Sequence, residues 1–178
     1  SIHTASRDWQ FAHQLGNAAY SSRVAEQARN VLERVVAEAA EIRSVSAAGT
    51  RLLVESFSEI NDMTLDWGSA RMEEGSEHFF AYAHERLTGR AYVHGELVGL
   101  GIVLMSILQN NDPRYVCDVL DAAGCEYSPQ AIGTSEEEVH FTLSALREFV
   151  VQNRLWDSVI DHVQIDPGSV IDAFRGLR

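Results

Sequence analysis

Two histidines in this sequence are placed for divalent-metal chemistry. His78 ends the tetrapeptide GSEH, and His94 opens the tripeptide HGE ahead of a long apolar run. Each histidine stands where a predicted helix begins. Imidazoles at the starts of two facing helices can reach one metal ion from two directions, and two histidines with one carboxylate leave a coordination position open for substrate. The sequence therefore predicts that His78 and His94 are two ligands of a catalytic metal site.

Polar residues beside the two histidines are candidates for supporting roles. Tyr82 and Glu85 lie on the same helical face as His78, because steps of four and seven residues return to one side of a helix. Glu77, Glu85 and Glu96 are candidate hydrogen-bond acceptors for the imidazoles, and such a bond fixes the tautomer of a metal ligand.

Arg71 is a further candidate, and two roles suit it. It either orients a substrate oxygen or a cofactor phosphate, or it neutralises the adjacent Glu73 and Glu74. Spacing alone also leaves a plainer interpretation of His78 and His94, in which they are an ordinary pair of helical histidines without a ligand.

The composition describes one globular domain with an acidic surface. The chain has 178 residues, 46% of them hydrophobic, and a formal net charge of −12. All 14 of its basic residues are arginines. An acidic surface repels nucleic-acid phosphates and anionic membranes, so neither is an expected partner. The absence of lysine excludes a Schiff-base or P-loop lysine within the chain.

The lack of a recognisable targeting signal and the cysteine usage both favour a cytoplasmic protein. No stretch resembles a signal peptide, and the longest apolar run, residues 97–108, is too short to cross a bilayer. Cys117 and Cys125 fit a reducing compartment and are expected to be two small buried thiols. The chain begins at Ser1 already in a helical pattern, which predicts that it is a piece of a longer protein.

Apolar residues recur at three- and four-residue steps along most of the chain, which predicts an all-α multi-helix bundle. Long amphipathic helices are expected at residues 21–43 and 45–67. The apolar stripe of the second is expected to contain Leu52, Leu53, Phe57, Ile60 and Leu65. We expect one helical domain that spans residues 1–178.

Capping signals mark the later helices. Asp112-Pro113 and Asp166-Pro167 each place a helix-capping acid before a proline of the first turn, and Ser135 begins a capping box. Helices are therefore expected to follow all three positions. Only residues 163–165 hint at a strand.

Residues 94–109 are apolar on nearly every side, which predicts a central, buried helix. Gly95, Gly99 and Gly101 each cost this helix roughly 1 kcal/mol relative to alanine. We expect that these glycines allow a neighbouring helix or a ligand to approach the backbone closely.

The two histidine motifs resemble the metal-binding half of the iron-containing alcohol dehydrogenase superfamily, which includes 3-dehydroquinate synthase. GSEH at residues 75–78 and HGE at residues 94–96, followed by a glycine-rich apolar helix, carry the resemblance. The sequence is most similar to the sn-glycerol-1-phosphate dehydrogenase group in TASRDW at residues 4–9, in the following Ala-His pair, and in Arg71 ahead of GSEH. The resemblance covers most of residues 1–113.

This resemblance implies the C-terminal helical domain of the dehydroquinate synthase-like fold, with the N-terminal nucleotide-binding α/β domain absent from this chain. In the superfamily one aspartate and two histidines hold a divalent metal (Zn, Fe or Ni), which polarises the substrate oxygen while NAD or NADP exchanges hydride. His78 and His94 match the histidines, and the aspartate would lie upstream of Ser1. The implied parent is a metal-dependent alcohol or polyol dehydrogenase acting on a small alcohol, polyol or carbonyl compound, with homo-oligomerisation open.

Two departures from the family pattern bear on the substrate. Tyr82 stands where a second histidine usually follows, with His84 displaced by two positions. Met72-Glu73-Glu74 replaces a small, proline-containing loop of the glycerol-1-phosphate group. Two carboxylates beside the site repel a phosphate monoester, so an uncharged polyol, aldehyde or ketone fits the charge better.

Two alternative functions stay open at this point. A cyclase or lyase of the dehydroquinate-synthase type would use the same metal site on a sugar phosphate, but it needs basic residues for phosphate, commonly lysines. A helical fragment without activity in isolation is the other alternative, and Tyr82 and the missing aspartate favour it.

Overall fold

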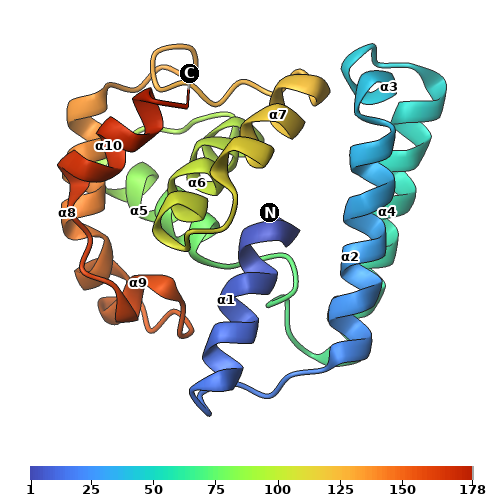
Figure 1. The fold of residues 1–178 in the computed structure, drawn as a ribbon, viewed down its shortest axis with the longest axis horizontal. Coiled ribbons are helices and arrows are strands. Elements are labelled where there is room, and N and C mark those ends of the chain that lie inside the picture. The colour runs from blue at the N-terminus through green and yellow to red at the C-terminus, as the bar shows by residue number, and fades with distance from the viewer. Residues whose placement is uncertain (178) are drawn as a thin grey trace.

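Helix α6 (His94–Leu108) lies at the centre of the computed structural model, which describes residues 1–177 (Figure 1). No strand occurs in that range, so the predicted all-α fold is confirmed. The other helices are α1 (Ile2–Gln14), α2 (Ser22–Ala37), α3 (Ala39–Arg43), α4 (Ala47–Trp67), α5 (Ser76–Thr88), α7 (Pro113–Ala123), α8 (Glu136–Gln152), α9 (Val159–His162) and α10 (Pro167–Arg175).

The predicted burial of α6 is confirmed, because every residue from Leu97 to Ser106 is buried. A Cβ atom at Gly101 would lie 2.6 Å from the carbonyl oxygen of Glu77, so α5 and α6 touch through their backbones there. Gly99 makes only ordinary contact, and Gly95 faces open space. Close helix approach therefore explains Gly101 alone.

The buried apolar residues form two clusters. The larger cluster surrounds α6 and takes residues from α5, α7, α8 and α10. The smaller one surrounds Trp9 of α1, which is fully buried against α2 and α4. Figure 1 shows the consequence, with α2 and α4 forming a hairpin at one side and α1 lying between that hairpin and the body around α6.

The long helix predicted at residues 21–43 is interrupted in the structure. It ends at Ala37, and α3 begins at Ala39 after a distorted Glu38. A Cβ atom at Gly49 would lie 2.5 Å from the carbonyl oxygen of Glu41, so α3 and the start of α4 are in backbone contact. The interruption redirects the chain, and α3 packs against both α4 and α7.

Helix α4 exposes part of its predicted apolar stripe. Phe57 and Leu65 are 71% and 72% exposed, which contradicts the expected burial of that stripe. The buried residues of α4 are Gly49, Ser56 and Ile60, so the predicted burial is confirmed for Ile60. Apolar residues occupy more than one face of α4, and only the face with Ser56 and Ile60 packs into the structure.

The later boundaries are confirmed by their capping bonds. Asp112 accepts a hydrogen bond from the backbone of Tyr115, and Ser135 forms the predicted capping box with Glu138. Residues 163–165 contain no strand and only connect α9 to α10.

Only one of the two cysteines is buried as the sequence predicts. Cys117 is buried as expected, whereas Cys125 is exposed, because it lies in the loop after α7. Among the helices of residues 1–177, none has both the length and the apolar composition that a membrane crossing requires.

Candidate metal centre

The side chains of His78 and His94 lie next to each other. Their ring centroids are 5.4 Å apart. His78 belongs to the first turn of α5, and His94 is the first residue of α6. The side chain of His78 is 16% exposed, and His94 is exposed. The packed helix pair thus presents two imidazoles together at one solvent-accessible point.

The carboxylate of Glu77 holds the His78 ring in place. Oε1 of Glu77 lies 2.9 Å from Nδ1 of His78 and also accepts a hydrogen bond from the backbone of Gly75. Oε2 accepts a hydrogen bond from the hydroxyl of Thr4 in α1. A carboxylate oxygen accepts hydrogen bonds, so Nδ1 of His78 carries a proton, and in the neutral ring Nε2 presents its lone pair.

Tyr82 completes an aromatic group with the two histidines. Its ring centroid lies 6.0 Å from that of His78 and 6.4 Å from that of His94. Its hydroxyl donates a 2.7 Å hydrogen bond to Glu74. Burial, followed by the bond to Glu74, raises the pKa of Tyr82 well above its usual range. Tyr82 is therefore a neutral phenol at physiological pH, with its proton directed to Glu74.

Carboxylates dominate the charge around this group. Glu73, Glu74 and Glu77 all lie close enough to Tyr82 to raise its pKa. Burial raises the pKa of Glu73, whose carboxylate accepts a hydrogen bond from Thr64. The charged side chains that act on Tyr82 are thus all acidic.

Two of the predicted supporting residues, Glu85 and Glu96, have other surroundings. Glu85 accepts a 3.4 Å hydrogen bond from the backbone of Tyr92, in the loop that leads to α6. Glu96 is half-buried, and its charge acts on the thiol of Cys125 rather than on the imidazole of His94. Within residues 1–177 the hydrogen bonds include none from His94 to Glu96.

Arg71 contacts the segment before α9, and within residues 1–177 no ion pair joins it to Glu73 or Glu74. It donates a hydrogen bond to the carbonyl oxygen of Asp157, and its guanidinium lies 5.5 Å from the ring centroid of Trp156. Trp156 in turn packs edge-on against Phe79. These contacts anchor the segment before α9 to the chain ahead of α5.

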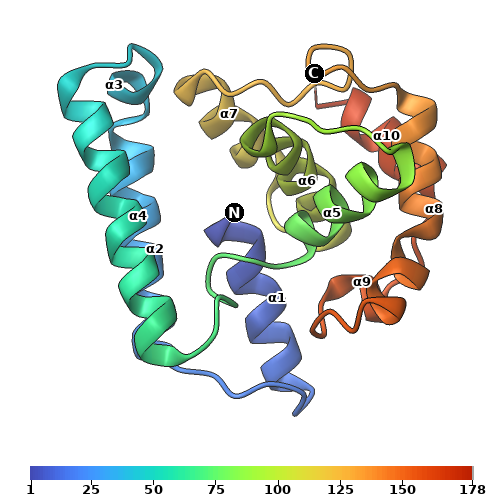
Figure 2. The same ribbon diagram turned by 180° about the vertical axis from the view of Figure 1, so that it is seen from behind.

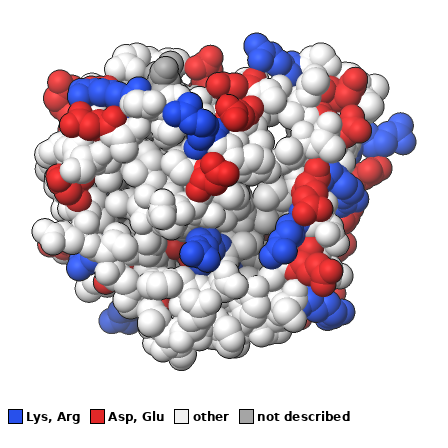
Figure 3. Space-filling view, viewed as in Figure 1, with Lys and Arg blue, Asp and Glu red and all other residues white. Residues whose placement is uncertain are grey.

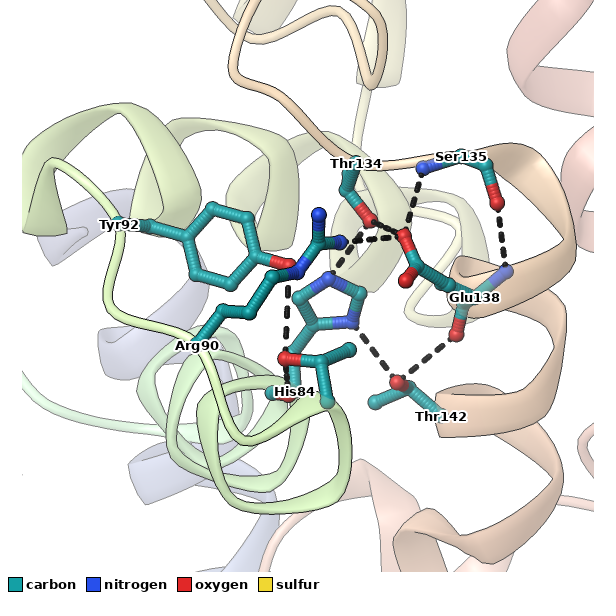
Figure 4. Close-up of polar contacts among 8 residues, drawn as sticks. His84, Arg90, Tyr92, Thr134, Ser135, Glu138 and Thr142 are labelled. Carbon is teal, nitrogen blue, oxygen red and sulfur yellow. Dashed lines mark hydrogen bonds and ion pairs between the residues drawn. The ribbon is translucent and has the colours of Figure 1, made fainter.

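His84, the displaced histidine, is buried in the core rather than in the site. Figure 4 shows its ring between two hydroxyls, with Nδ1 2.8 Å from Thr142 and Nε2 2.9 Å from Thr134. Thr134 also donates a hydrogen bond to Glu138. Burial lowers the pKa of His84 to about 4, so the ring is neutral at pH 7. His84 therefore joins α5 to α8.

The start of α1 lies beside the candidate centre. The hydroxyl of Thr4 in α1 donates a hydrogen bond to Glu77. Figure 2 shows the start of α1 close to the chain that enters α5. Within residues 1–177, no three His, Cys, Asp or Glu side chains are grouped so as to hold a metal ion. The described residues thus supply two neighbouring imidazoles and an opening beside them.

Two contributors to the site were missed by sequence reasoning. Thr4 is far from Glu77 in the sequence, and nothing in the pattern around either residue indicates their hydrogen bond. Glu74 was recognised as a nearby charge, but its bond to the Tyr82 hydroxyl was not. Both Glu74 and Tyr82 are polar residues near GSEH, and that proximity is the signal that could have indicated the pair.

Curated proteins similar to this chain share one activity name. The glycerol-1-phosphate dehydrogenases [NAD(P)+] of Methanobrevibacter smithii and Hyperthermus butylicus are each 32% identical over 136 residues. That of Aeropyrum pernix is 31% identical over 137 residues. These matches cover 76–77% of this chain and 39% of each relative. No protein-family model matches. The predicted resemblance to this group is confirmed.

Proposed function

Because three quarters of this chain is homologous to part of the glycerol-1-phosphate dehydrogenases, we propose that it is the metal-binding helical domain of an NAD(P)-linked alcohol or polyol dehydrogenase. The chain spans about 39% of the length of these relatives. We place the nucleotide-binding α/β domain in the remainder of the parent protein, and the parent in the cytoplasm. The observation that carries the proposal is the adjacency of His78 and His94 at the starts of two packed helices.

The two histidines fit a divalent metal ion. Nε2 of His78 is free to coordinate because Glu77 occupies Nδ1, and His94 lies beside it on the exposed side of the site. Imidazole suits Zn²⁺, Fe²⁺ and Ni²⁺ alike. A third ligand belongs to the part of the parent that precedes α1, since the start of α1 lies beside Glu77. A bound metal would act as a Lewis acid on the substrate oxygen.

The other residues of the site position groups and set the local charge. Glu77 fixes the tautomer and orientation of His78, and α1 supports Glu77 through Thr4. Tyr82 covers one side of both imidazoles and keeps its proton on the bond to Glu74. This arrangement leaves the exposed side of His94 as the approach for a substrate.

The charge of the site favours an uncharged substrate. The charged side chains that act on Tyr82 are all carboxylates, and like charges repel one another most strongly where water is excluded. A phosphate monoester is negatively charged, so glycerol or a similar small polyol, aldehyde or ketone is the substrate class we propose. Glycerol 1-phosphate, which gives the relatives their name, is the competing substrate.

Two other functions have less support. A cyclase or lyase acting on a sugar phosphate needs positive charge beside the metal, and here Glu73 and Glu74 are the neighbours. The alternative of a fragment that binds no ligand does not explain why the two imidazoles are adjacent and oriented.

The direct test uses the parent protein with its metal bound. Formation of NADH or NADPH is followed with glycerol and with glycerol 1-phosphate, and the account predicts a higher kcat/KM for glycerol. Glu74→Gln should shift the preference towards the phosphorylated substrate, because it removes one negative charge. Binding of neither NAD nor NADP by a metal-loaded parent would contradict the dehydrogenase function, and a strong preference for glycerol 1-phosphate would contradict only the proposed substrate.

A further inference from the structure

A polar cleft separates α1 from α2 on the face drawn in Figure 3. Its volume is about 370 Å³, and it is lined by α1, α2 and the start of α7. Figure 3 shows a hollow between α1 and α2, with basic side chains on both sides of it. His78 and His94 do not line this cleft, so it is distinct from the candidate metal centre.

Two arginines face the cleft from opposite walls, Arg7 on α1 and Arg29 on α2. Neither has a hydrogen bond or an ion pair to a side chain among residues 1–177. Elsewhere on the described chain, Arg34 is paired with Glu59, and Arg90 with Glu138. In a chain whose net charge is −12, two guanidinium groups without a carboxylate partner around one hollow indicate a place for an external anion.

The third wall of the cleft is fixed by hydrogen bonds. Nε2 of His3 lies 2.9 Å from the carbonyl oxygen of Asn111, and the Asn111 amide donates to the carbonyl oxygen of His3. The ring of Tyr115 packs against His3. These contacts join α1 to the start of α7, so the wall keeps its shape while the arginines remain free to turn towards a ligand.

We propose that this cleft binds the phosphate group of a small molecule, clamped between Arg7 and Arg29. Guanidinium groups present parallel N–H donors that match phosphate oxygens in pairs, and donors from two walls can surround one tetrahedral anion. Gln10 and Ser6 line the same cleft and add neutral donors. Glu33, on the α2 wall, is the one carboxylate of the lining and opposes the anion. The proposal does not depend on the metal centre.

Calorimetric titration of the 178-residue chain with inorganic phosphate and with glycerol phosphate tests the proposal, with glycerol as the uncharged comparison. Saturable binding of either anion and none of glycerol is the expected result. Arg7→Ala and Arg29→Ala should each weaken binding about tenfold, the loss expected for one charge-assisted hydrogen bond. Glu33→Gln should strengthen it. The matched control is Arg51→Ala, an exposed arginine of α4 outside the cleft, which should leave binding unchanged.

The outcomes separate the sources of the anion. Equal affinity for both anions identifies the phosphate group itself as the ligand, and tighter binding of glycerol phosphate assigns the cleft to a phosphorylated metabolite. Absence of saturable binding by both anions overturns the proposal, as does binding that survives the double substitution of Arg7 and Arg29. Both arginines are exposed and without partners, so the Arg7→Ala and Arg29→Ala variants should fold, which circular dichroism can check.

Discussion

Glu77 and His78 are neighbours in the sequence, and they join the buried interior to the exposed metal centre. The Glu77 side chain is fully buried and bonds to Nδ1 of His78, while its backbone carbonyl lies against Gly101 of α6. One residue thus fixes both the orientation of an imidazole and the spacing of the two helices that supply the histidines.

Glu77→Gln is expected to weaken metal binding. The variant loses the charge that orients His78, and loss of such a hydrogen-bond partner typically lowers metal affinity by roughly 10- to 100-fold. Competition with a chromogenic chelator measures the affinity. Glu85→Gln is the matched control, because Glu85 bonds to the backbone of Tyr92 instead. Equal affinity of the wild type and Glu77→Gln would show that Glu77 does not orient a ligand.

Gly101→Ala is expected to destabilise the fold. The added methyl would meet the α5 backbone at 2.6 Å, and overpacking of a core typically costs about 1–3 kcal/mol. Gly95→Ala in the same helix meets open space, and the better helix propensity of alanine should leave stability unchanged or higher. Urea denaturation of both metal-free variants compares them. A Gly101→Ala variant as stable as Gly95→Ala would contradict the described contact between α5 and α6.

Because His84 is buried as a neutral ring, the folded state should become less stable in mild acid. Its pKa is lowered from 6.5 to about 4 by burial, so the unfolded chain binds the proton more readily than the folded chain. The contribution of His84 is therefore complete above pH 6.5 and declines as the pH falls from 6.5 towards 4. Denaturation of wild type and His84→Gln at pH 7 and pH 5 tests this.

Substitution of His84 should reduce the difference between the two pH values, because glutamine does not titrate. Asp8 acts in the opposite direction, since burial raises its pKa to about 6 and favours the folded state as the pH falls below 6. The Asp8→Asn variant is thus the control, and it should increase the loss of stability on acidification. An unchanged pH dependence in His84→Gln would contradict the assignment of a buried, neutral imidazole.

The fold was predictable from the sequence wherever local signals were strong. The apolar run of α6 and the caps at Asp112 and Ser135 each act within a few residues, and the structure confirms all three. The break at Glu38 was not predictable, because it follows from contact between Gly49 and Glu41, which depends on how two helices pack. The exposure of Phe57 has the same origin, since periodicity identifies an apolar face but not the face that is buried.

The candidate site was also predictable only in part. Motif resemblance singled out His78 and His94, and the structure brings their rings together. The role of Thr4 depends on a contact between α1 and α5 that no local pattern encodes. Arg71 and Glu85 share a sequence neighbourhood with His78, yet their side chains contact Asp157 and Tyr92. Motif resemblance therefore identified the two ligand candidates better than proximity in sequence identified the residues that support them.

The measurement that tests the central claim most directly is titration of the metal-free parent protein, which also supplies the third ligand, with Co²⁺, followed by its visible absorption. The account predicts one Co²⁺ per chain, with a spectrum typical of imidazole coordination. That spectrum should be lost in His78→Ala and in His94→Ala and kept in His140→Ala, which removes an exposed histidine elsewhere. Absence of Co²⁺ binding by the wild type, or binding that persists in both site variants, would contradict the assignment of His78 and His94 as metal ligands.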